Sequence, residues 1–183
     1  MYDQDIRDAL KQFLMKRSPA PSKILDELKV NNGGARADVV ALYKYAHCFE
    51  IKSDRDSMSR VENQVLHYDL TFRKVTVVTT PKSLTSLLKR VPDYWGVLVA
   101  KDSIDSPKFT YHRRAKLNPN FNGEVALLSL WKNELIDLDS ILGSARLPKV
   151  CRREQIATKI SSEASNNDIA IAISKTLRKR IVS

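Results

Sequence analysis

Two carboxylates and a lysine are spaced in a way that suits metal-assisted hydrolysis. Asp38 lies in one apolar run, and Glu50, Ile51 and Lys52 end the next one. Side chains alternate along a strand, so Glu50 and Lys52 share a face, and a hairpin can bring Asp38 beside them. Two carboxylates bind a hard cation such as Mg2+, and the metal with a neighbouring ammonium can activate water against a phosphate. These residues therefore supply the parts needed for phosphodiester hydrolysis.

The three-residue pattern has low specificity by itself. Glu27, Leu28 and Lys29 have the same spacing in a segment whose apolar positions predict a helix. The alternative for Glu50 and Lys52 is a solvent-facing ion pair, which contributes little to stability. Their position at the end of an apolar strand, directly before a polar loop, favours a functional site.

The helix predicted after this loop adds two polar side chains on one face. Gln64 and Tyr68 are i, i+4 neighbours that could contact a phosphate or hold the region around Lys52 in place. The alternative is a half-buried tyrosine beside an exposed glutamine. The loop itself either forms local caps and ion pairs or reaches phosphates through Arg55 and Arg60, and the sequence leaves both possibilities open.

The elements that must position these residues follow from apolar periodicity. The expected helices are a first one carrying Ile6, Leu10, Phe13 and Leu14, followed by 22–29, 59–72 and about 81–91. The expected strands are 35–43, 47–52, 75–79 and 95–100. Strands joined by crossover helices predict an α/β sheet that is partly parallel.

The remainder of the chain has a different pattern. Residues 101–123 read as irregular, and periodic stretches near 151–163 and 167–182 predict an all-α C-terminal part. Trp95 and Trp131 are both expected in the core.

The charge of the chain points to a polyanionic partner. There are 31 Lys and Arg against 21 Asp and Glu, which gives a net charge of +10, and nucleic acid is the commonest partner of so basic a protein. The segment Lys108–Lys116 interleaves cations with aromatic rings, which suits phosphates and stacked bases. A second basic cluster, Lys175–Arg180, is weaker evidence because cations also favour helix ends. A solvated basic surface is the alternative.

Composition also restricts the compartment. Cys48 and Cys151 are too few for a disulfide framework or a four-cysteine metal site, which indicates a reducing environment. No apolar run approaches the roughly 20 residues that a membrane-spanning helix needs. A soluble cytoplasmic protein is therefore expected, with no membrane partner.

Taken together, the motif residues resemble the PD-(D/E)XK nucleases, which share the restriction-endonuclease-like fold. The match consists of Asp38, the strand Glu50-Ile51-Lys52, and Gln64-x-x-x-Tyr68, which resembles a feature of RecB-type members. The stretches Phe49–Asp56 and Tyr94–Leu98 are similar to small bacterial and phage proteins of that superfamily. The resemblance covers about residues 1–100, and it departs from the family pattern at Ala37, where a proline is usual.

The resemblance implies an α/β fold with a restriction-endonuclease-like core, αβββαβ, whose mixed sheet is flanked by helices. This core would occupy residues 1–104, and a basic, mostly helical extension would occupy 105–183. A short strand near Lys29–Asn31, or a split in 35–43, would complete the expected number of strands. The implied protein is a Mg2+- or Mn2+-dependent nuclease that hydrolyses DNA rather than RNA. A homodimer is compatible with this, because double-strand cutting often needs two active sites.

The resemblance also implies roles for particular residues. The implied catalytic residues are Asp38, Glu50 and Lys52. The implied metal ligands are Glu27, Asp38, Glu50 and the backbone carbonyl of Ile51. The implied residues for substrate binding or support of the site are Gln64, Tyr68, Arg36, Ser53, Arg55 and Arg60.

Two alternatives to a nuclease stay open from sequence. One is a catalytically silent protein with the same fold that binds nucleic acid or regulates. The other is a basic partner of another protein, with residues 101–183 as the interface. The helices of that region could also form a winged-helix-like DNA reader, although two or three short amphipathic helices are a generic pattern.

Overall fold

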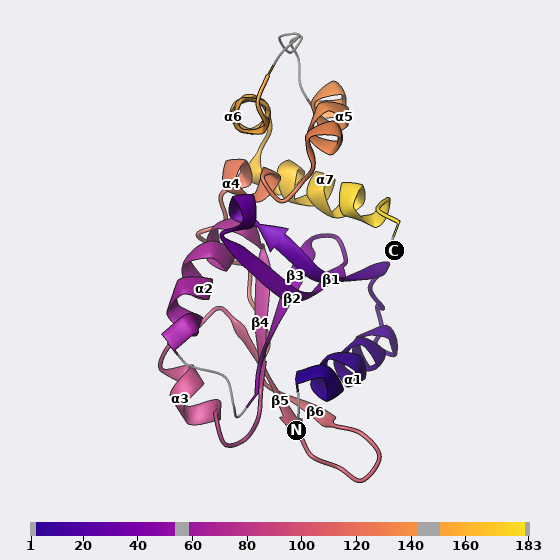
Figure 1. Cartoon of the computed structure of the whole chain (residues 1–183), viewed down its shortest axis with the longest axis vertical. Helices are drawn as coiled ribbons and strands as arrows, with labels where there is room; N and C mark the ends of the chain where they lie inside the picture. The colour runs from indigo at the N-terminus through magenta and orange to yellow at the C-terminus, as the bar shows by residue number, and fades with distance from the viewer. Residues whose placement is uncertain (1–2, 54–58, 143–150, 182–183) are drawn as a thin grey trace.

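The computed structural model describes residues 3–53, 59–142 and 151–181 (Figure 1). Within these residues, six strands form one mixed sheet in the order β1-β2-β3-β4-β5-β6. They are β1 (Lys23–Val30), β2 (Ala35–Leu42), β3 (Ala46–Lys52), β4 (Lys74–Thr79), β5 (Gly96–Lys101) and β6 (Lys108–Arg113). Strands β3, β4 and β5 are parallel to one another, and the remaining neighbours pair antiparallel. Helices connect the parallel strands, as crossover connections require.

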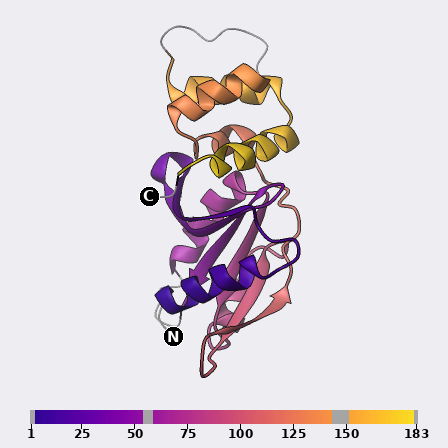
Figure 2. The same ribbon diagram turned by 90° about the vertical axis from the view of Figure 1, so that its right-hand side faces the viewer.

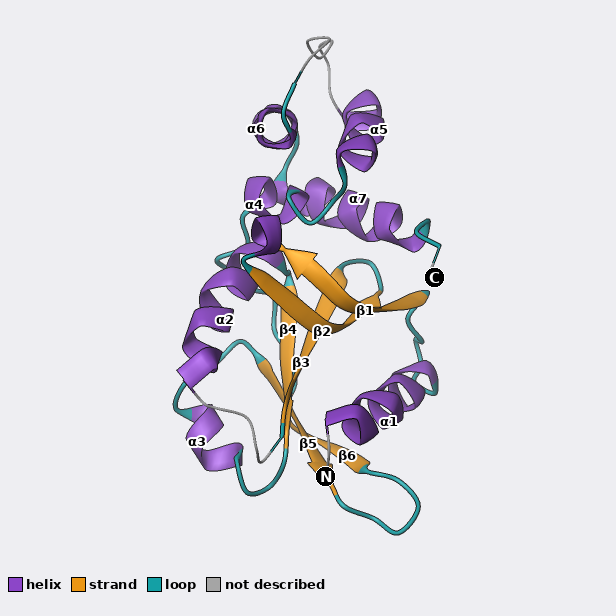
Figure 3. Cartoon of the chain, viewed as in Figure 1, coloured by secondary structure: helices purple, strands orange, loops and turns teal. Residues whose placement is uncertain are grey.

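Helices cover both faces of the sheet and one of its ends (Figures 1 and 3). They are α1 (Asp3–Met15), α2 (Ser59–Thr71), α3 (Leu84–Leu88), α4 (Gly123–Leu127), α5 (Lys132–Leu142), α6 (Arg153–Glu163) and α7 (Asn166–Arg178). Helix α1 buries Ile6, Leu10 and Leu14 against one face, in a cluster that includes Phe49. Helices α2 and α3 lie on the other face, and α4–α7 stack at the end of the sheet (Figure 2).

The mixed α/β class is confirmed, and so are the first helix, the helix after the polar loop and the four predicted strands. The C-terminal helices follow the predicted pattern: α6 lies within the expected stretch 151–163, and α7 overlaps the expected stretch 167–182 but begins one residue earlier. Among the described residues, no helix combines the length and apolar character needed to cross a membrane.

The segment 22–29 was expected to be helical, and this expectation is wrong, because Lys23–Val30 forms the edge strand β1. Glu27 has a φ of 55° and interrupts the alternation of the strand. Leu25 and Leu28 are consequently both buried at a spacing of three, which imitates the period of a helix. Pairing with β2 decided the structure of this segment.

Two further expectations about the elements need correction. The region 101–123 contains β6, an edge strand whose residues alternate between exposed and half-buried, so no continuous apolar run marked it. Helix α3 is limited to Leu84–Leu88, shorter than the predicted 81–91.

The division of the chain at residue 104 stays a prediction. Strand β6, beyond that boundary, belongs to the same sheet as β1–β5. Helices α4–α7 share one hydrophobic cluster with α2 and with strands of the sheet.

Candidate functional site

Glu50 is the centre of a buried polar cluster built from β3 and α2. Its side chain is 3% exposed and accepts a hydrogen bond from Lys52 Nζ at 2.8 Å. Gln64 Nε2 donates to the same oxygen, Oε1. The hydroxyl of Tyr68 lies 2.8 Å from the other oxygen, Oε2. Three residues that the sequence singled out therefore meet around the carboxylate of a fourth, Glu50.

The side chain of Tyr68 has a fixed protonation state in this cluster. Burial, the first cause, and the neighbouring groups raise the pKa of its hydroxyl far above the ordinary value. The hydroxyl stays protonated, and its proton is shared between Glu50 and the carbonyl oxygen of Arg36, also 2.8 Å away. Tyr68 thus ties α2 to both β3 and β2.

Asp38 lies on β2, where Oδ2 accepts a 2.8 Å hydrogen bond from the backbone N–H of Ile51. Its other oxygen, Oδ1, is 3.1 Å from Arg7 Nη2. Arg7 comes from α1 and also donates to the carbonyl oxygen of Asp38 at 3.2 Å. This carboxylate therefore joins α1, β2 and β3.

Glu27 completes the ion-pair network on β1. Its two oxygens contact Arg7 Nη1 at 2.6 Å and Arg36 Nε at 2.5 Å. Arg7 therefore bridges Glu27 and Asp38, and its side chain is 10% exposed. The three carboxylates of the network, Glu27, Asp38 and Glu50, are matched by three cations, Arg7, Arg36 and Lys52.

Arg7 was not among the predicted site residues. It follows the buried Ile6 and precedes Leu14 by seven residues, so it belongs to the face of α1 that packs on the sheet. A cation on the apolar face of an amphipathic helix was the signal that could have identified it, because a buried charge requires a partner.

The other predicted residues have varied positions. Ser53 is buried directly after β3, and the side chain of Arg36 is 63% exposed. Arg55 lies outside the described residues. Arg60 belongs to α2, but its side chain is outside what the structure describes.

The oxygens of these carboxylates are already engaged by cationic and amide groups. Arg7 occupies oxygens of both Glu27 and Asp38, and Lys52 with Gln64 occupies Glu50 Oε1. In the part of the chain that the structure describes, no three His, Cys, Asp or Glu residues group in a way that could hold a metal. Binding of Mg2+ or Mn2+ by Glu27, Asp38, Glu50 and Ile51 stays a prediction. In the structure, these carboxylates belong to a charge-neutralised network that connects α1 and α2 to the sheet.

A second cluster combines aromatic rings with cations where α1 meets β6, and we call it the aromatic–basic face. It consists of Phe13, Arg17, Tyr43, Phe109, Tyr111 and Arg114. The ring of Phe13 lies 5.1 Å from that of Phe109 and 6.4 Å from that of Tyr111. Helix α1 and strand β6 accordingly lie side by side in Figure 1.

Two guanidinium groups lie over the rings of this face. Arg17 is 5.3 Å from the centroid of Phe13 and 5.4 Å from that of Tyr111. Arg114 is exposed and lies 5.0 Å from the centroid of Tyr111. Among the described residues, neither arginine forms an ion pair with a carboxylate.

The pKa values of Tyr43 and Tyr111 also reflect the nearby arginines. Burial is the main cause that raises the pKa of Tyr43, and the nearby Arg17 partly offsets it. Burial also raises the pKa of Tyr111, against the effects of Arg17 and Arg114. Both hydroxyls therefore remain neutral at physiological pH, and the positive charge of the two arginines is not cancelled.

Comparison with known proteins gives the family. Residues 1–181 match the family described as Bacteriophage P4 protein cII. The chain belongs to this family. Protein cII of Enterobacteria phage P4 is 32% identical over 163 residues, which are 87% of this chain and 61% of that relative. The chain thus spans less than two thirds of the curated relative's length. No solved structure matches the chain.

Membership of the cII family corrects the main functional expectation. The assignment to the PD-(D/E)XK superfamily is wrong, and with it the assignments as a hydrolase, a nuclease and an endonuclease. The motif residues do meet in space, but Arg7, Arg36 and Lys52 neutralise the carboxylates. The restriction-endonuclease-like core is not confirmed beyond the mixed α/β class, whereas the phage relative agrees with the expected bacterial or phage source.

Proposed function

We propose that this cII-family protein is a non-catalytic regulatory protein that binds duplex DNA through the aromatic–basic face. The observation that carries the proposal is the pair Arg17 and Arg114, which lie over aromatic rings and pair with no carboxylate among the described residues. The net charge of +10 supports an anionic partner.

The geometry of the face favours phosphates over bases as its ligands. The rings of Phe13 and Tyr111 are half-buried and guanidinium groups already lie over them, so these rings are not free platforms for stacked bases. Stacking leaves the N–H groups of an arginine available, and guanidinium groups bind phosphate oxygens in a bidentate manner. Exposed Lys16, Lys108 and Lys116 extend the positive charge along the neighbouring chain. Such contacts position a protein on a duplex without reading its sequence.

The network around Glu50 and Asp38 has a structural role in this proposal. Charged groups that are buried and paired tie separate elements together, and here they connect α1, α2 and three strands. The side chain of Lys52 is 7% exposed and contacts Glu50, so it serves as the partner of that carboxylate rather than as a contact for substrate.

The test is binding of labelled duplex DNA over a series of salt concentrations. The variant Arg17→Ala/Arg114→Ala should bind more weakly, and the slope of log K against log salt should fall by about 2, since each lost phosphate contact removes about 0.9. The matched control is Lys82→Ala/Lys89→Ala, which removes the same charge from exposed positions on either side of α3.

Equal affinity and equal slope for the two double variants would overturn the role of the aromatic–basic face. A duplex RNA of the same sequence serves as a second ligand. Tighter binding of the RNA than of the DNA would overturn the choice of DNA.

A further inference from the structure

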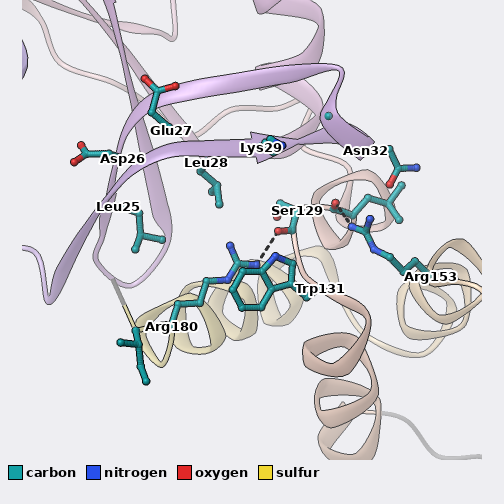
Figure 4. Close-up of a pocket in the computed structure, with 13 residues that line it drawn as sticks. Leu25, Asp26, Glu27, Leu28, Lys29, Asn32, Ser129, Trp131, Arg153 and Arg180 are labelled. Carbon is teal, nitrogen blue, oxygen red and sulfur yellow. Dashed lines mark hydrogen bonds between the residues drawn. The ribbon is translucent and has the colours of Figure 1, made fainter. Parts of the chain in front are cut away.

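A cavity of about 670 Å3 lies between the edge strand β1 and the C-terminal helices (Figure 4). Leu25, Leu28 and Lys29 of β1 form one wall, and Trp131 and Arg180 form the opposite wall. Its volume lies within the range of small-molecule sites, which is about 300–1,000 Å3. The cavity is separate from the aromatic–basic face, and Glu27 is the member of the ion-pair network that belongs to its lining.

Trp131 was expected in the core, and this expectation is wrong, because its side chain is 58% exposed. The guanidinium of Arg180 lies 4.3 Å from the centroid of its ring. Arg180 is fixed in turn by Glu134, with contacts of 2.7 and 2.6 Å, and by the carbonyl oxygen of Ser129 at 3.0 Å. Glu134 also accepts a 2.7 Å hydrogen bond from the backbone N–H of Trp131. A large exposed aromatic ring is thus held rigidly at the wall of a cavity.

The two carboxylates that line the cavity are paired with cations, whereas one lysine of its lining is not paired. Asp26 and Glu27 belong to its lining, but their carboxylates turn away from Trp131 in Figure 4. Lys11 pairs with Asp26 at 2.9 Å, and Arg7 and Arg36 pair with Glu27. Lys29, exposed on β1, has no acidic partner among the described residues.

The opposite wall contributes a second cation, Arg153, that pairs with no carboxylate among the described residues. Arg153 Nη2 donates to the carbonyl oxygens of Leu128 and Leu130 at 2.6 and 2.7 Å. Arg153 and Arg180 both belong to the cavity lining, and hydrogen bonds to backbone carbonyl oxygens hold each in a defined orientation. The cavity combines apolar side chains, one exposed aromatic ring and two cations, Lys29 and Arg153, that form no ion pair among the described residues.

We propose that this cavity binds a nucleobase, with its attached phosphate held toward Lys29 and Arg153. A base is flat and stacks on an indole ring, and Trp131 is still 58% exposed although Arg180 lies over one face of its ring. The leucines of β1 supply the apolar wall that such a ligand needs. Strand β1 is the first strand of the sheet, so the backbone groups along its outer side lack a strand partner in the described chain. These groups can hydrogen-bond to the edge of a base. The inference extends the proposed function, on which it rests, from duplex phosphates to a single unstacked base.

The test uses three probes, namely thymidine monophosphate, a short oligothymidylate, and an abasic oligonucleotide of the same length and charge. Trp95 is 1% exposed and Trp131 is 58% exposed, so quenching of tryptophan fluorescence reports mainly on Trp131. We expect quenching by both thymine-containing probes and none by the abasic one. The mononucleotide and the oligonucleotide arms distinguish a free nucleotide from a base within a strand.

Variants then identify the residue responsible, with binding measured by anisotropy of the labelled oligothymidylate. Trp131→Ala should weaken binding by about tenfold or more, because stacking on an aromatic ring contributes that much per base. Trp131→Phe should retain most of the affinity. The matched control Ile136→Ala, at an exposed position on α5 outside the cavity lining, should bind like the parent chain.

Unchanged affinity in Trp131→Ala, or equal quenching by the abasic probe, would overturn the nucleobase site. The emission of buried Trp95 in Trp131→Ala checks that the variant is folded, and Trp131→Phe provides the same test with less risk to the fold. Duplex binding through Arg17 and Arg114 is measured separately, so failure of this site and failure of the proposed function give different results.

Discussion

Replacing Lys52 with methionine removes the cation from a buried ion pair and keeps much of the side-chain volume. The Lys52 side chain is 7% exposed, and its partner Glu50 is 3% exposed. Removing one member of such a pair costs about 3–5 kcal/mol, because the other charge is left buried without compensation. Gln64 and Tyr68 still hydrogen-bond Glu50 in the variant, so the cost should fall at the lower end, about 3 kcal/mol.

The assay is equilibrium unfolding in urea together with thermal unfolding. A loss of about 3 kcal/mol corresponds to a decrease in Tm of about 6–12 °C for a chain of this size. The companion variant Glu50→Gln/Lys52→Met removes both charges and keeps a similar shape. It should recover most of the lost stability, because no uncompensated charge remains.

Two results would refute this reasoning. If Lys52→Met loses less than about 1 kcal/mol, the pair behaves like a surface ion pair and does not lock the structure. If the double variant is no more stable than Lys52→Met, the effect does not come from the unpaired carboxylate. A control at exposed Lys89, changed to methionine, should leave stability within about 0.5 kcal/mol of the parent chain.

Two further predictions follow from the same structure. Burial, and secondarily Lys74, lower the pKa of His47 to about 3, whereas the same side chain in an unfolded chain has a pKa near 6.5. The unfolded chain therefore binds the proton more readily, so stability should fall as the pH falls from about 6.5 toward 3. The loss should be at most about 1.4 kcal/mol per pH unit. Urea unfolding at several pH values should show a flatter pH dependence of stability for His47→Gln. The control His112→Gln, at an exposed position, should keep the pH dependence of the parent chain. Equal pH profiles for the two variants would contradict the assignment of this pH dependence to His47. Because Arg7 and Lys52 neutralise the carboxylates, duplex DNA incubated with the protein and Mg2+ or Mn2+ should stay uncut on a gel. Metal-dependent cleavage that disappears in Asp38→Asn would show that the non-catalytic assignment is wrong.

Local sequence patterns determined much of this protein. The apolar spacing of Ile6, Leu10 and Leu14 was sufficient to predict α1 and its buried face. The alternation along β3 and the i, i+4 spacing in α2 predicted that Glu50, Lys52, Gln64 and Tyr68 could lie close together, and they do. Short-range geometry fixes these relations, because a strand, a short connection and a helix leave few ways to arrange them.

The tertiary structure decided what the local patterns left ambiguous. Segment 23–30 has an apolar spacing that suits a helix, but it became a strand because β2 provides a partner and Glu27 adopts a left-handed conformation. Strand β6 has no continuous apolar run, since only alternate residues face the protein.

The character of the polar cluster also depended on contacts that are distant in the chain. Arg7 reaches Glu27 and Asp38 across 20 and 31 positions, and this contact turns a motif that suits metal binding into a neutralised network. Trp131 is 58% exposed, and its ring is held by Arg180, 49 positions later, which lies over one face and binds Glu134. The types of residue and their local spacing were present in the sequence, whereas the partner of each charge and each ring was set by packing between elements far apart in the chain.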